Sequence, residues 1–168
     1  MARSFSVVAL IVSAFCFSSV LAARVAPNAA PNGDDVFIVV GQIYCDPCGF
    51  QFQSRLSQPL DGVKVTLKCT KGDKNVTFVK ESTTDKNGVY NIECKGDHEE
   101  EVCKVKAENV KGACTKIMDN ESDSIVLTKN MGVPSLIRFV NPLGFMTQTI
   151  DAGCGKVVTE LGLDKLDD

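Results

Sequence analysis

The 168-residue sequence contains no tryptophan, only two tyrosines and a single histidine, His98. Without tryptophan, a surface that stacks on sugar rings would rest on phenylalanine. With one histidine, a structural zinc site would depend mainly on cysteine thiolates. We expect His98, in the polar stretch Gly96-Asp97-His98-Glu99, to be a solvated loop residue and not a catalytic base. No motif places a nucleophile beside it.

Several motifs of catalysis and nucleic-acid binding are also missing. There is no Gly-x-Ser-x-Gly, no glycine-rich phosphate loop and no basic stripe; the net charge is −3. We therefore expect no catalytic residue, no cofactor and no nucleic-acid partner. The acidic run Glu99-Glu100-Glu101 and the carboxylates Asp164, Asp167 and Asp168 suit either a calcium or partner surface or, as we expect, ordinary solvated faces.

One long apolar run exists, from Phe5 to Val20, with Arg3 before it and Val20-Leu21-Ala22 after it. This pattern predicts a signal peptide over residues 1–22. A membrane anchor is the alternative, but the run is short and interrupted by serines. We expect a secreted chain with no membrane span, and residues 23–35, with Pro27 and Pro31, to form a flexible leader. The sequons at Asn75 and Asn120 agree with secretion; we expect both to be exposed, and Asn75 to be the surer glycosylation site.

Cysteine is abundant: Cys16 would leave with the signal peptide, and seven cysteines remain. In a secreted chain these predict structural disulfides. A redox centre at Cys45-Asp46-Pro47-Cys48 and a zinc site are the alternatives. The pair follows a strand and not a helix start, which disfavours redox chemistry, and we expect no metal. The odd cysteine is either a buried thiol or an intermolecular bridge. Cys94 shares an expected strand face with Tyr90 and Ile92, which favours the buried thiol.

From residue 36 onward the pattern is that of β-strands. Val63, Val65, Leu67 and Cys69 alternate with polar residues, and so do Cys103, Val105 and Ala107. Asp85-Lys86-Asn87-Gly88 predicts a turn. The expected strands cover residues 36–44, 62–69, 76–81, 89–94, 102–107, 124–128 and 136–140. These predict one all-β domain over 36–168, with about seven short antiparallel strands in a sandwich or small barrel. Residues 155–161 predict a short helical turn, and 49–57 suit either helix or loop.

The stretch Gly41-Gln42-Ile43-Tyr44-Cys45-Asp46-Pro47-Cys48 resembles the signature of the pollen Ole e I-like proteins. The resemblance continues through 62–69, 84–90, 102–105, Asn141-Pro142-Leu143-Gly144-Phe145 and the later cysteines. It implies a secreted plant glycoprotein with three disulfides, Cys45–Cys114, Cys48–Cys154 and Cys69–Cys103, which leaves Cys94 as a free thiol. Gly49 stands where the family usually has arginine. A looser similarity, over 59–65 and 84–90, is to transthyretin-like β-sandwich modules.

The resemblance implies a non-enzymatic binding or signalling protein of the plant cell wall or apoplast, linked to pollen or pollen-tube growth, and a potential allergen. A small extracellular hydrolase or redox enzyme and a structural cell-wall protein are the alternatives. We expect a monomer whose partner is an extracellular protein or a cell-wall component. Phe50 and Phe52 are the candidate partner contacts, unless at least one of them packs into the core.

Overall fold

The computed structural model describes residues 35–72, 75–108 and 110–165, which belong to one compact unit. The predicted signal peptide and nearly all of the predicted leader lie outside the described residues. The strands are β1 (Val36–Asp46), β2 (Gln58–Pro59), β3 (Lys64–Lys71), β4 (Asn75–Thr83), β5 (Val89–Lys95), β6 (Val102–Glu108), β7 (Lys116–Asp119), β8 (Ile137–Phe139) and β9 (Leu143–Met146). They are followed by helix α2 (Cys154–Glu160) and a 3₁₀ turn, η1 (Leu163–Lys165).

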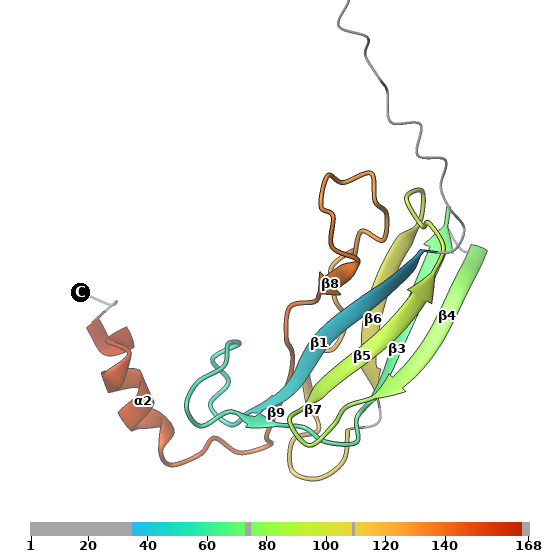
Figure 1. The fold of residues 1–168 in the computed structure, drawn as a ribbon. Coiled ribbons are helices and arrows are strands. Elements are labelled where there is room, and N and C mark those ends of the chain that lie inside the picture. Colours follow the sequence, from blue (N-terminus) through green and yellow to red (C-terminus); the bar gives the residue numbers. More distant parts are fainter. Residues whose placement is uncertain (1–34, 73–74, 109, 166–168) are drawn as a thin grey trace, which may run out of the picture. The chain divides into compact units, whose positions relative to one another are not determined.

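The strands form two sheets, and this confirms the all-β class and the sandwich (Figure 1). The smaller sheet has the order β4-β3-β6, with both pairs antiparallel. The larger sheet is built on β1, which pairs with β2 and β5 antiparallel and with β8 and β9 parallel. The expectation of antiparallel pairing is therefore wrong for β8, the strand predicted at 136–140; β9, which was not predicted, is parallel to β1 and antiparallel to β7. Both strands reach β1 through longer connections and not through tight hairpins.

The core lies between the sheets, because alternate residues of each strand point to it. The alternation predicted for β3 and β6 is confirmed: Val65, Leu67, Val105 and Ala107 are fully buried. The inner face of β5 is confirmed too, since one core cluster contains residues of β1, β3, β5 and β6.

The predicted strands differ from the observed ones at several positions. Residues 124–128, expected as a strand, form only one isolated bridge, between Ile125 and Cys103. Strands β2, β7 and β9 were not predicted, since β2 and β7 are short and β9 contains Gly144, which weakens its strand signal. A Cβ at Gly144 would overlap the flexible end of the Met118 side chain and come within 3.1 Å of the Tyr44 ring, so a larger residue would require both side chains to shift. Residues 49–57, undecided from sequence, form bends and turns.

The predicted turn at Asp85–Gly88 is confirmed by its hydrogen bonds. The Asp85 carboxylate accepts from the backbone N–H groups of Asn87 and Val89, at 2.8 and 2.9 Å. Gly88 has a φ of +72°, and a Cβ there would lie 2.4 Å from the carbonyl oxygen of Ile43. Only glycine fits this position, because any side chain would collide with the β1 backbone.

Helix α2 confirms the predicted C-terminal helical turn. Its buried residues are Cys154 and Val157. The Arg55 guanidinium pairs with Glu160 at 2.6 Å, which places the loop after β1 beside this helix. A seven-residue helix is marginal alone, so these attachments hold it.

Candidate functional site

Strand β8 buries its charged residue and exposes its hydrophobic ones. Arg138 is buried, whereas Phe139 is 81% exposed and Ile137 43% exposed. A half-buried strand normally turns its apolar side chains to the core. The orientation of β8 therefore places two large hydrophobic side chains in solvent at the cost of burying a guanidinium.

Backbone carbonyls stabilise the buried guanidinium of Arg138. It donates to the carbonyl oxygens of Val126 and Thr128, at 2.9 and 2.8 Å, and also to those of Ser135 and Ile137. It lies 5.0 Å from the ring centre of Phe37, a cation–π contact. These bonds attach the segment before β8 to the strand, so they fix which side of β8 faces outward.

The exposed side chains around β8 form an apolar surface, the β8 patch, defined by Val126, Met131, Ile137 and Phe139. Val126 and Met131 are each nearly half exposed. Together with Phe139 they line a groove of about 260 Å³ whose polar members include Ser124 and Asn141. Contiguous exposed apolar side chains of this kind mark interaction sites more often than scattered single residues do.

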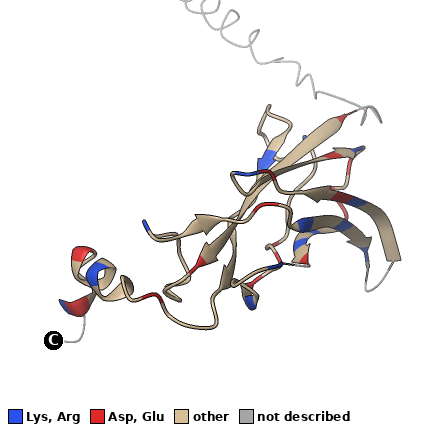
Figure 2. Ribbon diagram, turned by 90° about the horizontal axis from the view of Figure 1, so that it is seen from below, with Lys and Arg blue, Asp and Glu red and all other residues tan. Residues whose placement is uncertain are grey.

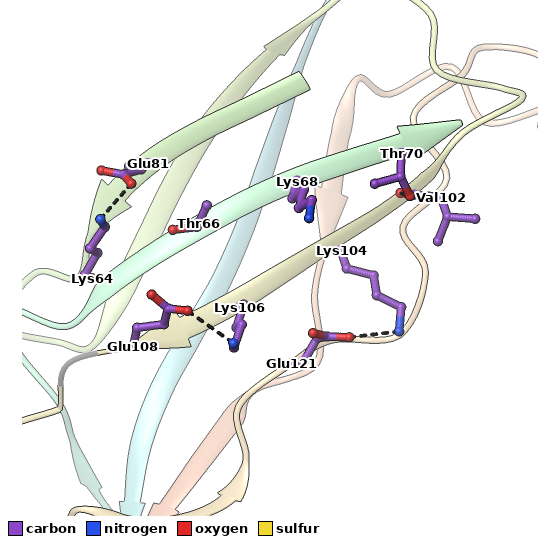
Figure 3. Close-up of a pocket in the computed structure, with 10 residues that line it drawn as sticks. All are labelled: Lys64, Thr66, Lys68, Thr70, Glu81, Val102, Lys104, Lys106, Glu108 and Glu121. Carbon is purple, nitrogen blue, oxygen red and sulfur yellow. Dashed lines mark hydrogen bonds and ion pairs between the residues drawn. The ribbon is translucent and has the colours of Figure 1, made fainter. Parts of the chain in front are cut away.

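The outer face of the β4-β3-β6 sheet carries a second candidate surface, the lysine face, defined by Lys64, Lys68, Lys104 and Lys106 (Figure 3). These side chains border a hollow of about 490 Å³. Lys68 lies directly opposite Lys104 across the β3–β6 pair. Like charges in that relation are unfavourable, which makes this pair a potential contact for an anion.

Glutamates offset most of the positive charge of the lysine face. Glu81 lies 2.6 Å from Lys64, Glu121 3.0 Å from Lys104 and Glu108 3.2 Å from Lys106. Lys68 makes no ion pair within the described part of the chain, and Figure 3 draws none. Figure 2 likewise shows basic and acidic residues interspersed along the strands. The surface is therefore a mosaic of both signs and not a basic stripe.

A polar cluster lies inside the sandwich and corrects the expectation for His98. This residue is in a loop, as predicted, but it is buried, with only 8% exposed. Its Nδ1 lies 2.8 Å from the Glu101 carboxylate, and its Nε2 lies 3.1 Å from the carbonyl oxygen of Lys95 and 3.2 Å from Cys94 Sγ. The backbone N–H of His98 donates to the carbonyl of Leu127, which holds the loop against the core.

The surroundings of this cluster shift the pKa values of two of its groups, Glu101 and Cys94. Burial alone would raise the pKa of Glu101, but hydrogen bonds from Thr77 and His98 outweigh it and the pKa is lowered. Burial raises the pKa of the Cys94 thiol to about 11, with a further contribution from the negative charge of Glu101. Cys94 is thus a neutral thiol at neutral pH, although it contacts His98, whose other ring nitrogen contacts the Glu101 carboxylate. With no exposed surface, it lacks the access that a nucleophile needs.

The Cys-Asp-Pro-Cys motif has a structural role in this fold. Asp46 is fully buried, and its carboxylate accepts from the backbone N–H groups of Cys48, Gly49 and Gln51, at 2.9 to 3.0 Å. These bonds shape the turn that leaves β1. Cys45 and Cys48 are bonded to different partners, so the motif is not a dithiol pair.

The structure contains the disulfides Cys45–Cys114, Cys48–Cys154 and Cys69–Cys103. They are the three pairs that the resemblance implies. Among the described residues Cys94 is the cysteine outside a disulfide, and it is buried on the face of β5 where the alternation places it.

The phenylalanines expected as partner contacts, Phe50 and Phe52, stack on each other with ring centres 5.4 Å apart. Neither belongs to the core cluster, and Phe52 is 43% exposed.

The sequence also contains two sequons, at Asn75 and Asn120. Asn75 is exposed at the start of β4, as expected, but the expectation of exposure is wrong for Asn120, which is half-buried and donates to the carbonyl of Ala107.

The acidic run does not form one solvated face. Glu100 pairs with Lys71 at 2.6 Å on the surface, whereas Glu101 points inward to His98. Asp164 is exposed in η1. Asp167 and Asp168 lie outside the described residues.

Comparison with known proteins identifies the family. The model of the family described as pollen protein Ole e 1 like matches residues 35–162. The chain belongs to the pollen Ole e 1-like family. A pollen-specific protein-like chain of Arabidopsis thaliana is 42% identical, over 90% of this chain and 91% of its own length. The pollen allergen Che a 1 of Chenopodium album is 37% identical, over 92% of both chains.

A solved structure supports the fold of this Ole e 1-like chain. The crystal structure of the major plantain pollen allergen Pla l 1 matches with a TM-score of 0.63 and 30% identity, covering 71% of this chain and all of that one. The family is thus one of pollen proteins and allergens. Among the described residues, helices are too short or too polar to cross a membrane.

Sequence reasoning missed the β8 patch. Residues 136–140 were recognised as a strand, but the pattern Ile-Arg-Phe gives no sign that the arginine points inward. The bonds that bury Arg138 come from residues up to twelve positions away, at Val126. The sequence therefore offers no local signal that would have located this patch.

Proposed function

We propose that this chain is a secreted, non-enzymatic binding protein of the pollen extracellular space, and that the β8 patch is its contact surface for a protein partner. One observation carries the proposal: Phe139 is 81% exposed on a strand whose orientation is fixed by the buried Arg138. Membership of a pollen protein family supports the pollen setting.

The chemistry of the patch favours a protein partner. Aromatic and methionine side chains are enriched in the buried centres of protein interfaces, and a few such residues supply most of the binding energy. Phe139 and Met131 supply these types, with aliphatic Val126 beside them in the groove. The segment before β8 is already held by Arg138, so little conformational entropy would be lost on binding.

The test compares the binding of labelled full-length protein to hydrated pollen and growing pollen tubes. The Phe139→Ala variant should lose at least tenfold in affinity while its melting temperature stays unchanged, because the side chain makes few contacts in the free protein. Ile150→Ala, a substitution at another exposed hydrophobic residue, is the matched control and should bind normally. If wild type and Phe139→Ala bind equally well, the β8 patch is not the contact surface for the partner. A Phe52→Ala variant tests the contact expected from sequence.

The lysine face supports a second candidate, an anionic cell-wall polysaccharide as ligand. The observation that favours it is the opposed pair Lys68 and Lys104 beside Thr66 and Thr70 in one hollow. With polygalacturonate as probe, binding should weaken steeply with salt and fall in Lys68→Ala, while Phe139→Ala has no effect. Salt-independent binding, or an unaffected Lys68→Ala variant, would remove this candidate.

A further inference from the structure

Strand β8 forms an edge of the larger sheet, because within the described part of the chain it pairs with β1 alone (Figure 1). In a parallel pair, alternate residues of one strand bond to the other strand. The Leu136 carbonyl accepts from the Ile38 N–H at 3.0 Å. The Val140 N–H donates to the Val40 carbonyl at 2.8 Å. Every second residue from Leu136 to Val140 therefore turns its backbone N–H and C=O groups toward β1.

The two residues between these, Ile137 and Phe139, turn their backbone groups away from β1. Those of Ile137 have local partners. Its N–H donates to the Ser135 hydroxyl at 3.1 Å, and its carbonyl accepts from the Arg138 guanidinium at 3.1 Å. The N–H and C=O of Phe139 make no hydrogen bond to another described residue outside the ladder with β1. Unpaired backbone groups on a strand edge are a template for pairing with another chain.

The groove of the β8 patch lies beside this edge. Its lining residues come from β8 and the residues after it, from Met131 and from the segment 122–126. The segment is attached to β6 by the bridge between Ile125 and Cys103, and to β8 by the bond from Arg138 to the Val126 carbonyl. Both sides of the groove are thus held in place. A chain bound in the groove would therefore lie next to the strand whose backbone is unpaired.

The charge of the groove favours a basic ligand. Two charged side chains, Asp123 and Arg138, are among its lining residues. The Arg138 guanidinium is buried and already bonded to four backbone carbonyls. Asp123 is exposed, and its carboxylate makes no ion pair with another described residue. A lysine or arginine of the ligand would complement this carboxylate.

We propose that the partner of the β8 patch supplies an extended segment, with apolar and basic side chains, that adds to β8 as a further strand. This inference rests on the proposed function of the patch. Main-chain groups of the segment bond to the N–H and C=O of Phe139. Its apolar side chains contact Phe139 and Val126, and a basic one pairs with Asp123. In such strand addition the backbone bonds give affinity and the side-chain contacts give specificity.

The first experiment removes the backbone N–H of Phe139 and keeps its side chain. Cell-free translation with the α-hydroxy acid analogue of phenylalanine at position 139 replaces this amide by an ester in the full-length protein. Binding to hydrated pollen should weaken about fivefold, because one intermolecular hydrogen bond is lost. The melting temperature should stay unchanged, because this N–H points away from β1. The same replacement at Ile150, another exposed residue, is the matched control and should bind normally.

Comparison with Phe139→Ala separates this inference from the proposed function. If Phe139→Ala loses binding but the ester at position 139 binds like wild type, the patch is the contact surface and strand addition is wrong. If neither change weakens binding, the proposed function fails, and this inference fails with it. Sedimentation of the purified protein should show a monomer. A dimer that the ester at position 139 disrupts would mean that a second copy of this chain, and not a partner, occupies the edge.

The second experiment tests the charge of the bound segment. Asp123→Asn should weaken binding to hydrated pollen about threefold, and the binding that remains should depend less on salt, because an ion pair at the surface is lost. Asp119→Asn is the matched control, since Asp119 is also exposed but does not line the groove. It should bind and respond to salt as the wild type does. Unchanged binding by Asp123→Asn, or the same loss in Asp119→Asn, would contradict a basic segment in the groove.

Discussion

At the scale of single residues, the fold depends on a few buried polar side chains whose partners are backbone atoms. Asp46 shapes the turn after β1 through three backbone N–H groups, and Arg138 fixes β8 through carbonyl oxygens. A buried charge is tolerable only where such bonds replace its hydration. The Tyr90 hydroxyl, in contrast, has no hydrogen-bond partner, and burial raises its pKa.

Replacing Arg138 by methionine should lower the free energy of unfolding by about 3 kcal/mol, because carbonyl acceptors lose a charged donor and the contact with Phe37 disappears. Urea denaturation measures the change. Arg55→Met is the matched control, since the Arg55 ion pair is on the surface and its loss should change stability little. If Arg138→Met leaves the free energy of unfolding unchanged, β8 is held by other contacts.

The Cys94 thiol should make stability sensitive to alkaline pH. Its pKa is about 11 in the fold, compared with an ordinary value of 9.0, so the native state retains the thiol proton longer than the unfolded chain does. The contribution is fully present below pH 9 and is lost as the pH rises through 11. In urea titrations at pH 8 and pH 10.5, the wild type should lose more stability than Cys94→Ala. The same loss in both proteins would contradict the shift.

At the scale of elements, disulfides attach what the sheets do not hold. The Cys48–Cys154 bond joins residues 106 positions apart and connects α2 to the end of β1. Cross-links that close long loops restrict the unfolded chain most. The short helix depends on this bond and on a few contacts with the loop after β1, such as the ion pair between Arg55 and Glu160.

Removing this bond by Cys48→Ser/Cys154→Ser should release α2 and lower stability by about 2–5 kcal/mol, far more than Cys94→Ser does. Hydrogen exchange should show α2 amides losing protection, while amides of β3 and β6 keep theirs. If α2 stays protected, its packing and not the disulfide holds it.

The elements also show what sequence can predict. Strands β3, β5 and β6 were predictable because each alternates, with one face in the core. The parallel pairing of β8 and β9 with β1 was not predictable, since both strands are short and their pairing depends on contacts far along the chain. His98 was misplaced for a related reason: its polar neighbours indicate a loop, but only the fold shows that the loop turns inward. The disulfide pairs came from resemblance, because spacing alone leaves many patterns open.

At the scale of the whole molecule, exposure should decide where glycans are attached. Asn75 lies open at the start of β4. Asn120 donates to Ala107, and the hydroxyl of its sequon residue Ser122 is buried and accepts from the Val105 N–H. These contacts make the second sequon costly to modify in the folded chain.

For protein expressed in plant cells, we expect Asn75→Gln to remove the mass shift produced by N-glycosidase, and Asn120→Gln to leave it in place. The intact mass of each variant, measured before and after N-glycosidase treatment, tests this expectation. A shift that persists when both asparagines are replaced would contradict the assignment.

Strand β1 is the first strand of the described chain but pairs with strands that come much later, and this has a consequence for synthesis. Its parallel partners β8 and β9 begin about a hundred residues later. At a translation rate of roughly 5–20 residues per second, β1 waits about 5–20 s for them. During that interval its hydrogen-bonding edge and the hydrophobic side of the unfinished sheet are uncovered. We expect the larger sheet to close only after β8 and β9 have been synthesised, and the nascent chain to need a chaperone until then.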